Sequence, residues 1–394
     1  MIFNTPWFLL FTIVFLLFYL LFSPARFRPY LLLVGSVIFH AHFAGPAGMA
    51  PVLVVAAITF VMGILIDESS PASKRRVVLL VLGLSIPVLV LCLYKYAHLL
   101  FGVFVEAPTE YSLVGLSIPL AISFFTFEFV HYLTDVYKGS RAIRNPFHFS
   151  LFTVFFPSLV SGPIKRFQDF IPQIAKPIAR PDSTTLMMGF QQVVIGFAKK
   201  LIVADNASIA CKLIEAQPEQ SPLTVLALMG LLSVRILFDF SGYSDIAIGL
   251  ARLLGIRIPP NFNFPYAARN LADFWRRWHI SLSSWIRDYL YIPLGGSRHG
   301  WARKCFNLLI AMFICGMWHG PEWHFGVWGI YHGLGLGVHT VWSSSGIAAR
   351  FTNSRVCSVI SCAFTNLFVA YGWLIFFYPV KRVWSLTMSL FGLG

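Results

Sequence analysis

The segment Arg269–Gly320 sets this chain apart from an ordinary succession of hydrophobic helices, and it reads RNLADFWRRWHISLSSWIRDYLYIPLGGSRHGWARKCFNLLIAMFICGMWHG. Two Trp-His pairs, at 278–279 and 318–319, flank a charged stretch, a Gly-Gly loop and a short apolar run. Residues 269–292 contain no glycine or proline, so we expect one continuous helix there. The organisation of the remaining chain is best understood as a support for these two histidines.

On that helix a cationic stripe would face an aromatic wall. The stripe, within about 40° of one direction, would hold four residues: Arg269, Arg276, Ser283 and Arg287. His279 would lie about 60° to one side of it, and Trp278 and Trp285 would belong to the wall. In a soluble protein this pattern would indicate an amphipathic surface helix, but the composition of the chain argues against that interpretation.

The composition indicates an integral membrane protein with many spans. Of 394 residues, 57% are hydrophobic and 12% are charged, whereas a soluble domain carries roughly 25% charged residues. Because a spanning helix needs about 20 apolar residues, the chain could supply roughly ten. The net charge of +14 does not indicate nucleic-acid binding, because the basic residues occupy short loops. The six cysteines form no CxxC motif.

Charge in the loops predicts the orientation of the first spans. Five apolar runs are candidates for spans: 5–22, 29–43, 50–66, 77–98 and 113–136. The loops 23–28, 67–76 and 137–147 carry two, three and three Lys or Arg residues, whereas 44–49 and 99–112 carry none. Basic loops remain in the cytoplasm. We therefore expect an uncleaved, extracytoplasmic N-terminus in a multi-pass membrane protein.

The next segments indicate a cavity at membrane depth. Residues 147–160 are too short to cross and lie between basic loops, so we expect a re-entrant segment. The runs 185–210, 222–240, 326–342 and 357–380 can span. Asp239 and Asp245 lie beside apolar sequence, where carboxylates face a cavity or a partner. The structural alternative is that they pair with Arg276, Arg277 and Arg287.

His319 is the first candidate for a catalytic group. An apolar run of about 14 residues separates it from the basic loop, a length of about 21 Å in a bilayer core of roughly 30 Å. The following Gly320-Pro321 should break the helix. A neutral imidazole at such depth could accept a proton from a hydroxyl group. The alternative, which the residues leave open, is a histidine that hydrogen-bonds across helices, and the same choice applies to His279.

Two further patterns are weaker. His324, His332 and His339 would share a helix face, but their spacing is wider than that of common metal motifs, so a tunnel lining is the preferred interpretation and no metal is expected. The loop GGSRHGWARK at 295–304 could hold an anionic donor through backbone amides and basic side chains, or could serve only as a cytoplasmic anchor. No GxSxG or GxxxxGK[ST] motif is present.

The stretches FWRRWHISLSSWIRDYLYIPLGG and GMWHGPEWHFGVWGIYHG resemble the membrane-bound O-acyltransferases. Additional similar stretches are SIPLAISFFTFEFVHYLTDVYKG, FFPSLVSGPIKRF and FDFSGYSDIAIGLARLLGI, so the resemblance covers most of 113–340. The branch that it indicates O-acetylates extracellular polysaccharides, as in the alginate and peptidoglycan systems.

The resemblance implies an all-α membrane fold of roughly ten to eleven helices, with re-entrant segments around a central funnel or tunnel. It implies one domain over 1–394, with peripheral helices at 1–112, a catalytic core at 113–340 and a C-terminal segment at 341–394 that is shorter than in relatives. His319 takes the position of the essential histidine and His279 that of the second motif histidine. Residues around these two are expected to bind donor or acceptor or to line the tunnel: Arg276, Trp278, Ser283, Arg287, Asp288, Trp318 and His332.

The resemblance implies a protein of the bacterial inner membrane that transfers an acetyl group from a cytoplasmic thioester substrate, acetyl-coenzyme A or another acyl thioester, to a hydroxyl group. That hydroxyl belongs to an extracytoplasmic polysaccharide or to a periplasmic or membrane-anchored acetyltransferase partner. No bound cofactor is expected. Three alternatives remain: D-alanyl transfer to teichoic acid, a transporter, and a non-catalytic scaffold of a polysaccharide-synthesis complex. One departure from relatives is Glu322, a carboxylate close to His319 in sequence.

Overall fold

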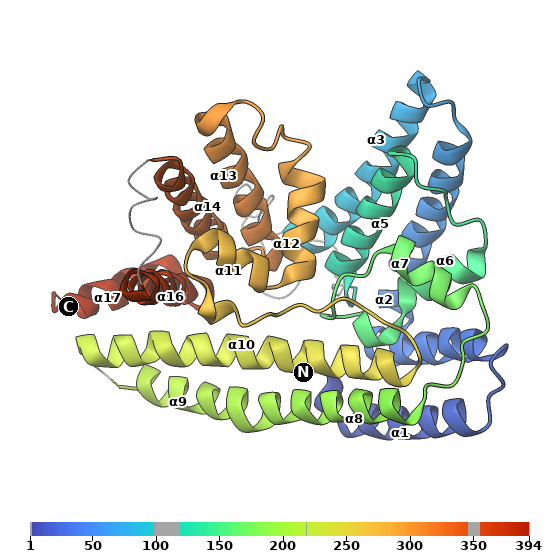
Figure 1. Ribbon diagram of the computed structural model, residues 1–394, viewed down its shortest axis with the longest axis horizontal. Helices are drawn as coiled ribbons and strands as arrows, with labels where there is room; N and C mark the ends of the chain where they lie inside the picture. The colour runs from blue at the N-terminus through green and yellow to red at the C-terminus, as the bar shows by residue number, and fades with distance from the viewer. Residues whose placement is uncertain (1, 98, 100–118, 218, 346–354, 394) are drawn as a thin grey trace. The chain divides into compact units, whose positions relative to one another are not determined.

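The computed structural model describes residues 2–97, 99, 119–217, 219–345 and 355–393, and every regular element in this part of the chain is a helix (Figure 1). The expected loop 99–112 and the first residues of the expected span 113–136 lie outside the described residues, apart from residue 99. The α-helices are α1 Pro6–Leu21, α2 Arg28–Glu68, α3 Lys74–Leu91, α5 Ile122–Tyr137, α6 Pro146–Val154, α7 Phe167–Ile174, α8 Ser183–Ala198, α9 Asp205–Glu215, α10 Pro222–Leu253, α11 Leu271–Arg277, α12 Ile280–Ile286, α13 Gly300–His319, α14 Trp323–Ser344, α16 Arg355–Phe377 and α17 Val380–Leu390.

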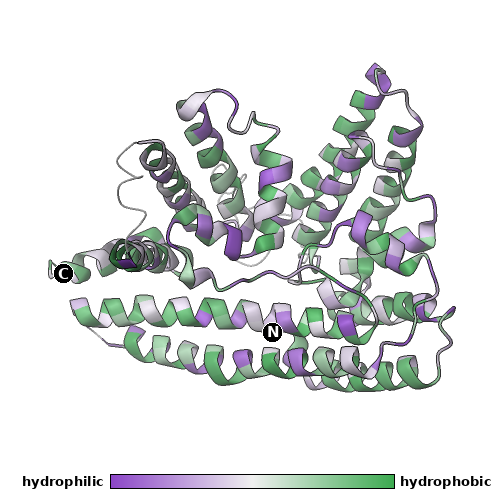
Figure 2. Cartoon of the chain, in the orientation of Figure 1, coloured by the Kyte–Doolittle hydropathy of each residue, from purple (hydrophilic) through white to green (hydrophobic). Residues whose placement is uncertain are grey.

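Five helical segments within the described residues are long and apolar enough to cross a membrane, which confirms a multi-pass membrane protein. They are Arg28–Glu68, Lys74–Tyr96, Ser183–Glu215, Pro222–Leu253 and Arg355–Phe377. Hydrophobic residues cover most of their turns (Figure 2), and many of these side chains are exposed, as expected of surfaces that face lipid. The shorter α1 is also apolar.

Helix α2 contains two of the expected spans. The runs 29–43 and 50–66 join in one element that bends at Gly45, where the backbone is left-handed in φ (65°) and Pro46 follows. An L-residue other than glycine is strained at this φ, so the bend depends on glycine. The predicted loop 44–49 is therefore a kink between two helical halves and not an open loop.

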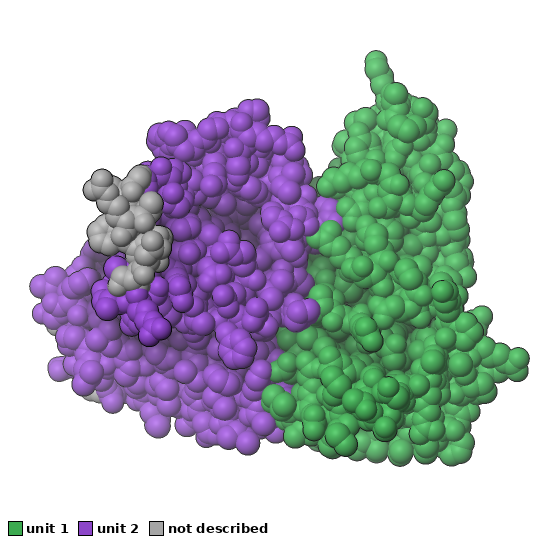
Figure 3. Space-filling view, viewed as in Figure 1, with its two compact units in different colours: residues 1–195, 243–259 green, residues 196–242, 260–394 purple. Residues whose placement is uncertain are grey.

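The chain divides into two compact units, coloured separately in Figure 3. Unit 1 comprises residues 1–195 and 243–259, and unit 2 comprises residues 196–242 and 260–394. The Trp-His pairs at 278–279 and 318–319 both belong to unit 2, so the candidate site can be described within one unit.

In unit 1, aromatic side chains of α6 and α7 pack against a buried ion pair. Lys165 Nζ donates to Glu128 Oε1, and both side chains are more than nine-tenths buried. Phe152 and Phe170 lie against the ammonium, with ring centroids 4.8 and 5.6 Å from Nζ. The pair ties α5 to the chain after α6. The expected re-entrant segment 147–160 forms all of α6 except its first residue, together with the turn that follows, and residues 151–159 are all buried.

Polar contacts in unit 1 connect loops that charge counting assigns to one side of the membrane. Arg144 pairs with Asp67, at 3.0 Å, and with Glu68. Arg28 donates to the carbonyl of Ile178 at 3.0 Å. The basic loops 67–76 and 137–147 therefore meet.

In unit 2 a lysine bridges two carboxylates within the long helices. Lys200 Nζ, in a π-helical turn at Lys199–Ala204, lies 2.7 Å from an oxygen of Asp205 and 2.7 Å from an oxygen of Asp239. Asp245, which belongs to unit 1, accepts a hydrogen bond from Gln192 at 3.3 Å. For Asp239, the alternative of a pairing with Arg276, Arg277 or Arg287 is therefore replaced by an ion pair with Lys200 of the preceding long helical segment.

Candidate functional site

His319 is the last residue of α13, and the helix break after it confirms the prediction from Gly320-Pro321. Helix α14 begins three residues after that break starts, at Trp323. A Cβ atom at Gly320 would lie 2.1 Å from the ring of Phe325 and 2.5 Å from Oε2 of Glu322. A larger residue would therefore displace the Phe325 ring and the Glu322 carboxylate, which pack against the backbone next to His319.

The His319 ring is half-buried in an aromatic surround. Its centroid lies 4.7 Å from that of Trp318, 4.9 Å from Phe376 and 5.4 Å from Trp328. The Phe376 and Trp328 rings meet the imidazole edge to face, at 81° and 88°. This surround restricts the access of water to the imidazole and limits the directions from which a substrate could reach it.

His279 occupies a break where we predicted a continuous helix over 269–292, and that prediction is wrong. Helix α11 ends at Arg277, and α12 begins at Ile280. His279 itself has φ 41° and ψ 56°, in the left-handed region that residues other than glycine rarely adopt. A π-helical turn, Arg287–Tyr291, then ends the segment. The cationic stripe that depended on an unbroken helix is therefore not formed.

The imidazole of His279 is buried, with 2% of the residue exposed. Phe240 contacts it edge to face at 4.5 Å between centroids, and Trp318 lies at 6.3 Å. Within the described residues, Nε2 has no hydrogen-bond partner. His279 lies outside the candidate spans; burial and, to a lesser extent, the charge of nearby His319 hold the pKa of its imidazole well below the usual range. The residue is therefore a neutral imidazole near neutral pH.

Trp318 connects the two histidines. Its ring contacts His319 at 4.7 Å and His279 at 6.3 Å between centroids, and His319 acts electrostatically on His279. The structure thus brings together three residues that the sequence predicted for the site. These are a half-buried imidazole, a fully buried imidazole and the indole between them.

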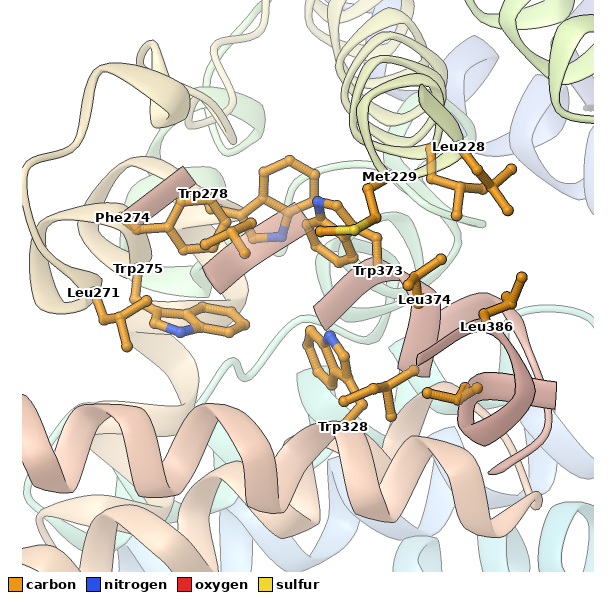
Figure 4. Close-up of a cluster of buried hydrophobic side chains, with 14 of the residues drawn as sticks. Leu228, Met229, Leu271, Phe274, Trp275, Trp278, Trp328, Trp373, Leu374 and Leu386 are labelled. Atoms are coloured by element: carbon orange, nitrogen blue, oxygen red, sulfur yellow. The ribbon is translucent and has the colours of Figure 1, made fainter. Parts of the chain in front are cut away.

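Two other predicted residues lie in the hydrophobic core of unit 2, part of which is drawn in Figure 4. Trp278 packs against Trp373, with 4.9 Å between ring centroids. His332 is fully buried, and neither ring nitrogen has a hydrogen-bond partner among the described residues. Its nearest rings include Trp328 at 4.9 Å and Trp275 at 5.3 Å. The aromatic cluster therefore surrounds His332, and one of its members, Trp328, also contacts His319.

The predicted polar residues of the RRWH segment contact their own neighbours in sequence. The side chains of Arg276 and Arg287 are 69% and 63% exposed. Arg276 pairs with Asp273 at 3.4 Å, and Arg287 pairs with Asp288 at 2.8 Å. Ser283 donates to the carbonyl of Trp278 at 3.0 Å.

Three aromatic residues of the site were not predicted. Phe240, Trp328 and Phe376 come from α10, α14 and α16 respectively. Phe240 lies in the FDFSGYSD stretch, where only the two carboxylates were interpreted as candidates for a cavity. No local signal marks Phe376, because its role follows from how α16 packs in unit 2.

The Gly-Gly loop uses several of its backbone amides internally. Gly295 N–H donates to Ile292 O, Gly296 N–H to Tyr291 O, and Arg298 N–H to Gly295 O. These amides are therefore engaged before any anionic donor arrives. The exposed side chains of Arg298 and Arg303 are the groups of this loop that can meet one.

Comparison with known proteins identifies the family of the chain. Residues 133–380 match the model of the MBOAT, or membrane-bound O-acyltransferase, family. The chain belongs to the membrane-bound O-acyltransferases.

Among individual relatives, the chain is 36% identical to a probable alginate O-acetylase, AlgI, of Pseudomonas aeruginosa. The alignment covers all of this chain and 75% of that protein. It is 32% identical to a peptidoglycan O-acetyltransferase of Helicobacter pylori, over 96% of this chain and 72% of that one. A teichoic acid D-alanyltransferase of Bacillus subtilis is 30% identical over 65% of this chain and 68% of its own. The predicted family, enzyme class and all-helical membrane fold are thereby confirmed.

Proposed function

We propose that the chain transfers an acetyl group from a thioester donor, acetyl-coenzyme A, to a hydroxyl group of an extracytoplasmic polysaccharide or of a partner protein that acetylates one. The observation that carries this proposal is the pair of imidazoles in unit 2, one half-buried at a helix end and the other buried, with Trp318 in contact with both. The similarity to alginate and peptidoglycan O-acetylating proteins extends over nearly the whole chain. The similarity to a D-alanyltransferase covers 65% of it, which favours acetyl transfer.

In this proposal His319 is the general base. A neutral ring nitrogen accepts the proton of the acceptor hydroxyl while the hydroxyl oxygen attacks the carbonyl carbon of the thioester. The C–O bond forms, the C–S bond breaks, and the thiolate leaving group takes the proton back from the imidazolium. The aromatic surround of Trp318, Trp328 and Phe376 keeps water away from the carbonyl and limits hydrolysis.

His279 has a supporting role. Its imidazole is neutral and buried, so it is suited to orient a substrate group by hydrogen bonding and not to carry positive charge. Arg298 and Arg303 of the cytoplasmic loop supply cationic side chains for the phosphates of the donor. A periplasmic or membrane-anchored acetyltransferase partner would receive the acetyl group on the extracytoplasmic side of the membrane.

The test uses the full chain in proteoliposomes with acetyl-labelled acetyl-coenzyme A and alginate oligosaccharides as the acceptor probe. We expect release of the coenzyme A thiol and transfer of label, with His319→Ala lowering the rate by at least about 10²-fold. His42→Ala, which changes an exposed histidine of unit 1 that belongs neither to the site nor to the donor loop, is the control and should retain full activity.

Each rival function predicts a different result. Undiminished turnover in His319→Ala would overturn the assignment of the base. Uptake of donor without thiol release would indicate a transporter, and polysaccharide acetylation in cells that survives replacement of both histidines would indicate a scaffold. Consumption of a D-alanyl carrier thioester in place of acetyl-coenzyme A would indicate the teichoic acid branch.

A further inference from the structure

The backbone at His279 is left-handed, with φ 41° and ψ 56°. Only a few per cent of residues other than glycine adopt a positive φ, although histidine does so more often than most, and such a conformation persists where the surrounding structure holds it. Nothing in the local sequence RRWHISLSS breaks a helix. The cause of the break must therefore lie elsewhere in the chain.

The segment 261–263 holds the break open from both sides. Ile280 N–H donates to Asn261 O at 2.9 Å, and Asn263 N–H donates to Arg277 O at 3.0 Å. In a continuous helix, the amide of Ile280 would bond to the carbonyl four residues earlier, and the Arg277 carbonyl would accept from Ser281. Both backbone groups turn instead to the loop, one on each side of His279.

The side chain of Asn261 replaces the missing helical acceptor. Its Oδ1 accepts the Ser281 hydroxyl at 2.6 Å and the Ser281 amide at 3.4 Å. That amide is the group that would otherwise pair with Arg277 O. Asn261 is 1% exposed, so no water competes for these donors. One residue thus engages Ile280 through its backbone and Ser281 through its side chain.

The conformation at residue 279 decides where the imidazole lies. With the break in place, the ring meets Phe240 at 4.5 Å and lies 6.3 Å from Trp318. Helical dihedral angles would redirect the Cα–Cβ bond and take the ring away from these contacts. We propose that Asn261 is a positioning residue that fixes His279 in its left-handed conformation and thereby aims its imidazole at Trp318, an inference that rests on the proposed role of His279 in acyl transfer.

A double-mutant cycle on turnover tests whether Asn261 acts through His279. Asn261→Leu keeps the size of the side chain and removes the acceptor, whereas Asn261→Asp keeps an oxygen at Oδ1. We expect Asn261→Leu to lower kcat about tenfold, roughly the worth of one hydrogen bond, with little change in the KM for acetyl-coenzyme A. Asn261→Asp should retain most of the kcat that Asn261→Leu loses. In a His279→Ala background, Asn261→Leu should cause almost no further loss, and an equal loss in both backgrounds would overturn the proposal.

Hydrogen exchange supplies a readout that does not depend on activity. We expect the amides of Ile280 and Ser281 to exchange roughly tenfold faster in Asn261→Leu than in the unmodified chain. Asn263→Ala is the matched control, because residue 263 joins this loop through its main chain and its side chain is exposed. Unchanged exchange in Asn261→Leu would overturn the proposal.

A milder variant and a separate outcome keep the two proposals distinguishable. If Asn261→Leu does not fold, Ser281→Ala removes only the 2.6 Å hydroxyl bond and should show the same changes at smaller size. If His279→Ala is fully active, the role of His279 in the reaction fails. Hydrogen exchange then still decides whether Asn261 holds the backbone.

Discussion

The two histidines differ in which end of a helix they occupy. His319 is the last residue of the twenty-residue α13, whereas His279 is the residue immediately before α12. The C-terminus of a helix favours a positive charge nearby and the N-terminus disfavours one, by about 0.3–1 kcal/mol each. The end of α13 therefore favours a transient imidazolium at His319, in agreement with its proposed role, whereas His279 lies between the end of α11 and the start of α12, whose effects oppose each other.

Replacing His279 by glycine or by alanine tests the backbone strain at this residue. Both changes delete the imidazole, so both should lower turnover. In a helix interior, glycine is about 1 kcal/mol less stable than alanine. At φ 41° alanine is strained by about 1–2 kcal/mol, so we expect His279→Gly to unfold at no lower temperature than His279→Ala. Thermal unfolding in detergent measures this, and a clearly lower midpoint for the glycine variant would contradict it.

At the scale of elements, glycines bring α13 and α14 into close contact. A Cβ atom at Gly316 would lie 2.2 Å from the carbonyl oxygen of Phe325, and one at Gly329 would lie 2.3 Å from that of Met312. Small residues allow helices in membranes to approach at backbone distance. This contact also fixes Trp328 of α14 against His319 of α13, at 5.4 Å between centroids.

We expect Gly329→Ala to destabilise the protein by about 1–3 kcal/mol, because the added methyl group meets a backbone carbonyl and not a flexible side chain. Turnover should fall as well, since Trp328 must shift relative to His319. The matched control is Gly230→Ala in α10, where an added Cβ atom meets nothing within 4 Å. Thermal unfolding and thiol release measured on both variants check the prediction; equal effects would show that the close approach of α13 and α14 is not what matters.

At the scale of the whole molecule, membrane orientation follows from the loops. The ion pairs of Arg144 with Asp67 and Glu68 join two loops that carry positive charge, and charge counting places both in the cytoplasm. Two loops in contact must lie on the same side of the membrane. The structure thus supports the relative placement of these loops, and the absolute orientation stays a prediction.

Cysteine labelling checks that orientation. In a chain whose six cysteines are replaced by serine, an impermeant thiol reagent should label Gln217→Cys in intact cells. Ser70→Cys should react only after the membrane is permeabilised. Both side chains are exposed, so a difference in labelling would report on the side of the membrane. The opposite pattern would reverse the predicted topology.

The part of the site that sequence could predict is the part with a local cause. The break after His319 follows from Gly320-Pro321, which are visible in the chain. The break at His279 follows from Asn261, eighteen positions earlier, whose hydrogen bonds exist only after folding. Similarly, nothing local indicates that Asp239 pairs with Lys200 on another long helix. Apolar runs located the five helical segments that are long and apolar enough to cross a bilayer, because length and hydrophobicity decide that property and are visible in the sequence.

The buried pair of Glu128 and Lys165 has a consequence for how the protein is made. Thirty-seven residues separate the two charges, so Glu128 leaves the ribosome and reaches the insertion machinery before its partner is synthesised. In the predicted span 113–136, which contains Glu128, a lone carboxyl group would remain protonated or near the membrane surface during that interval, since an unpaired charge at the bilayer centre costs about 2.5–3.5 kcal/mol on insertion scales. A substitution of either residue would therefore act first on biogenesis, and the amount of protein that escapes quality control would fall before the activity of each surviving molecule did.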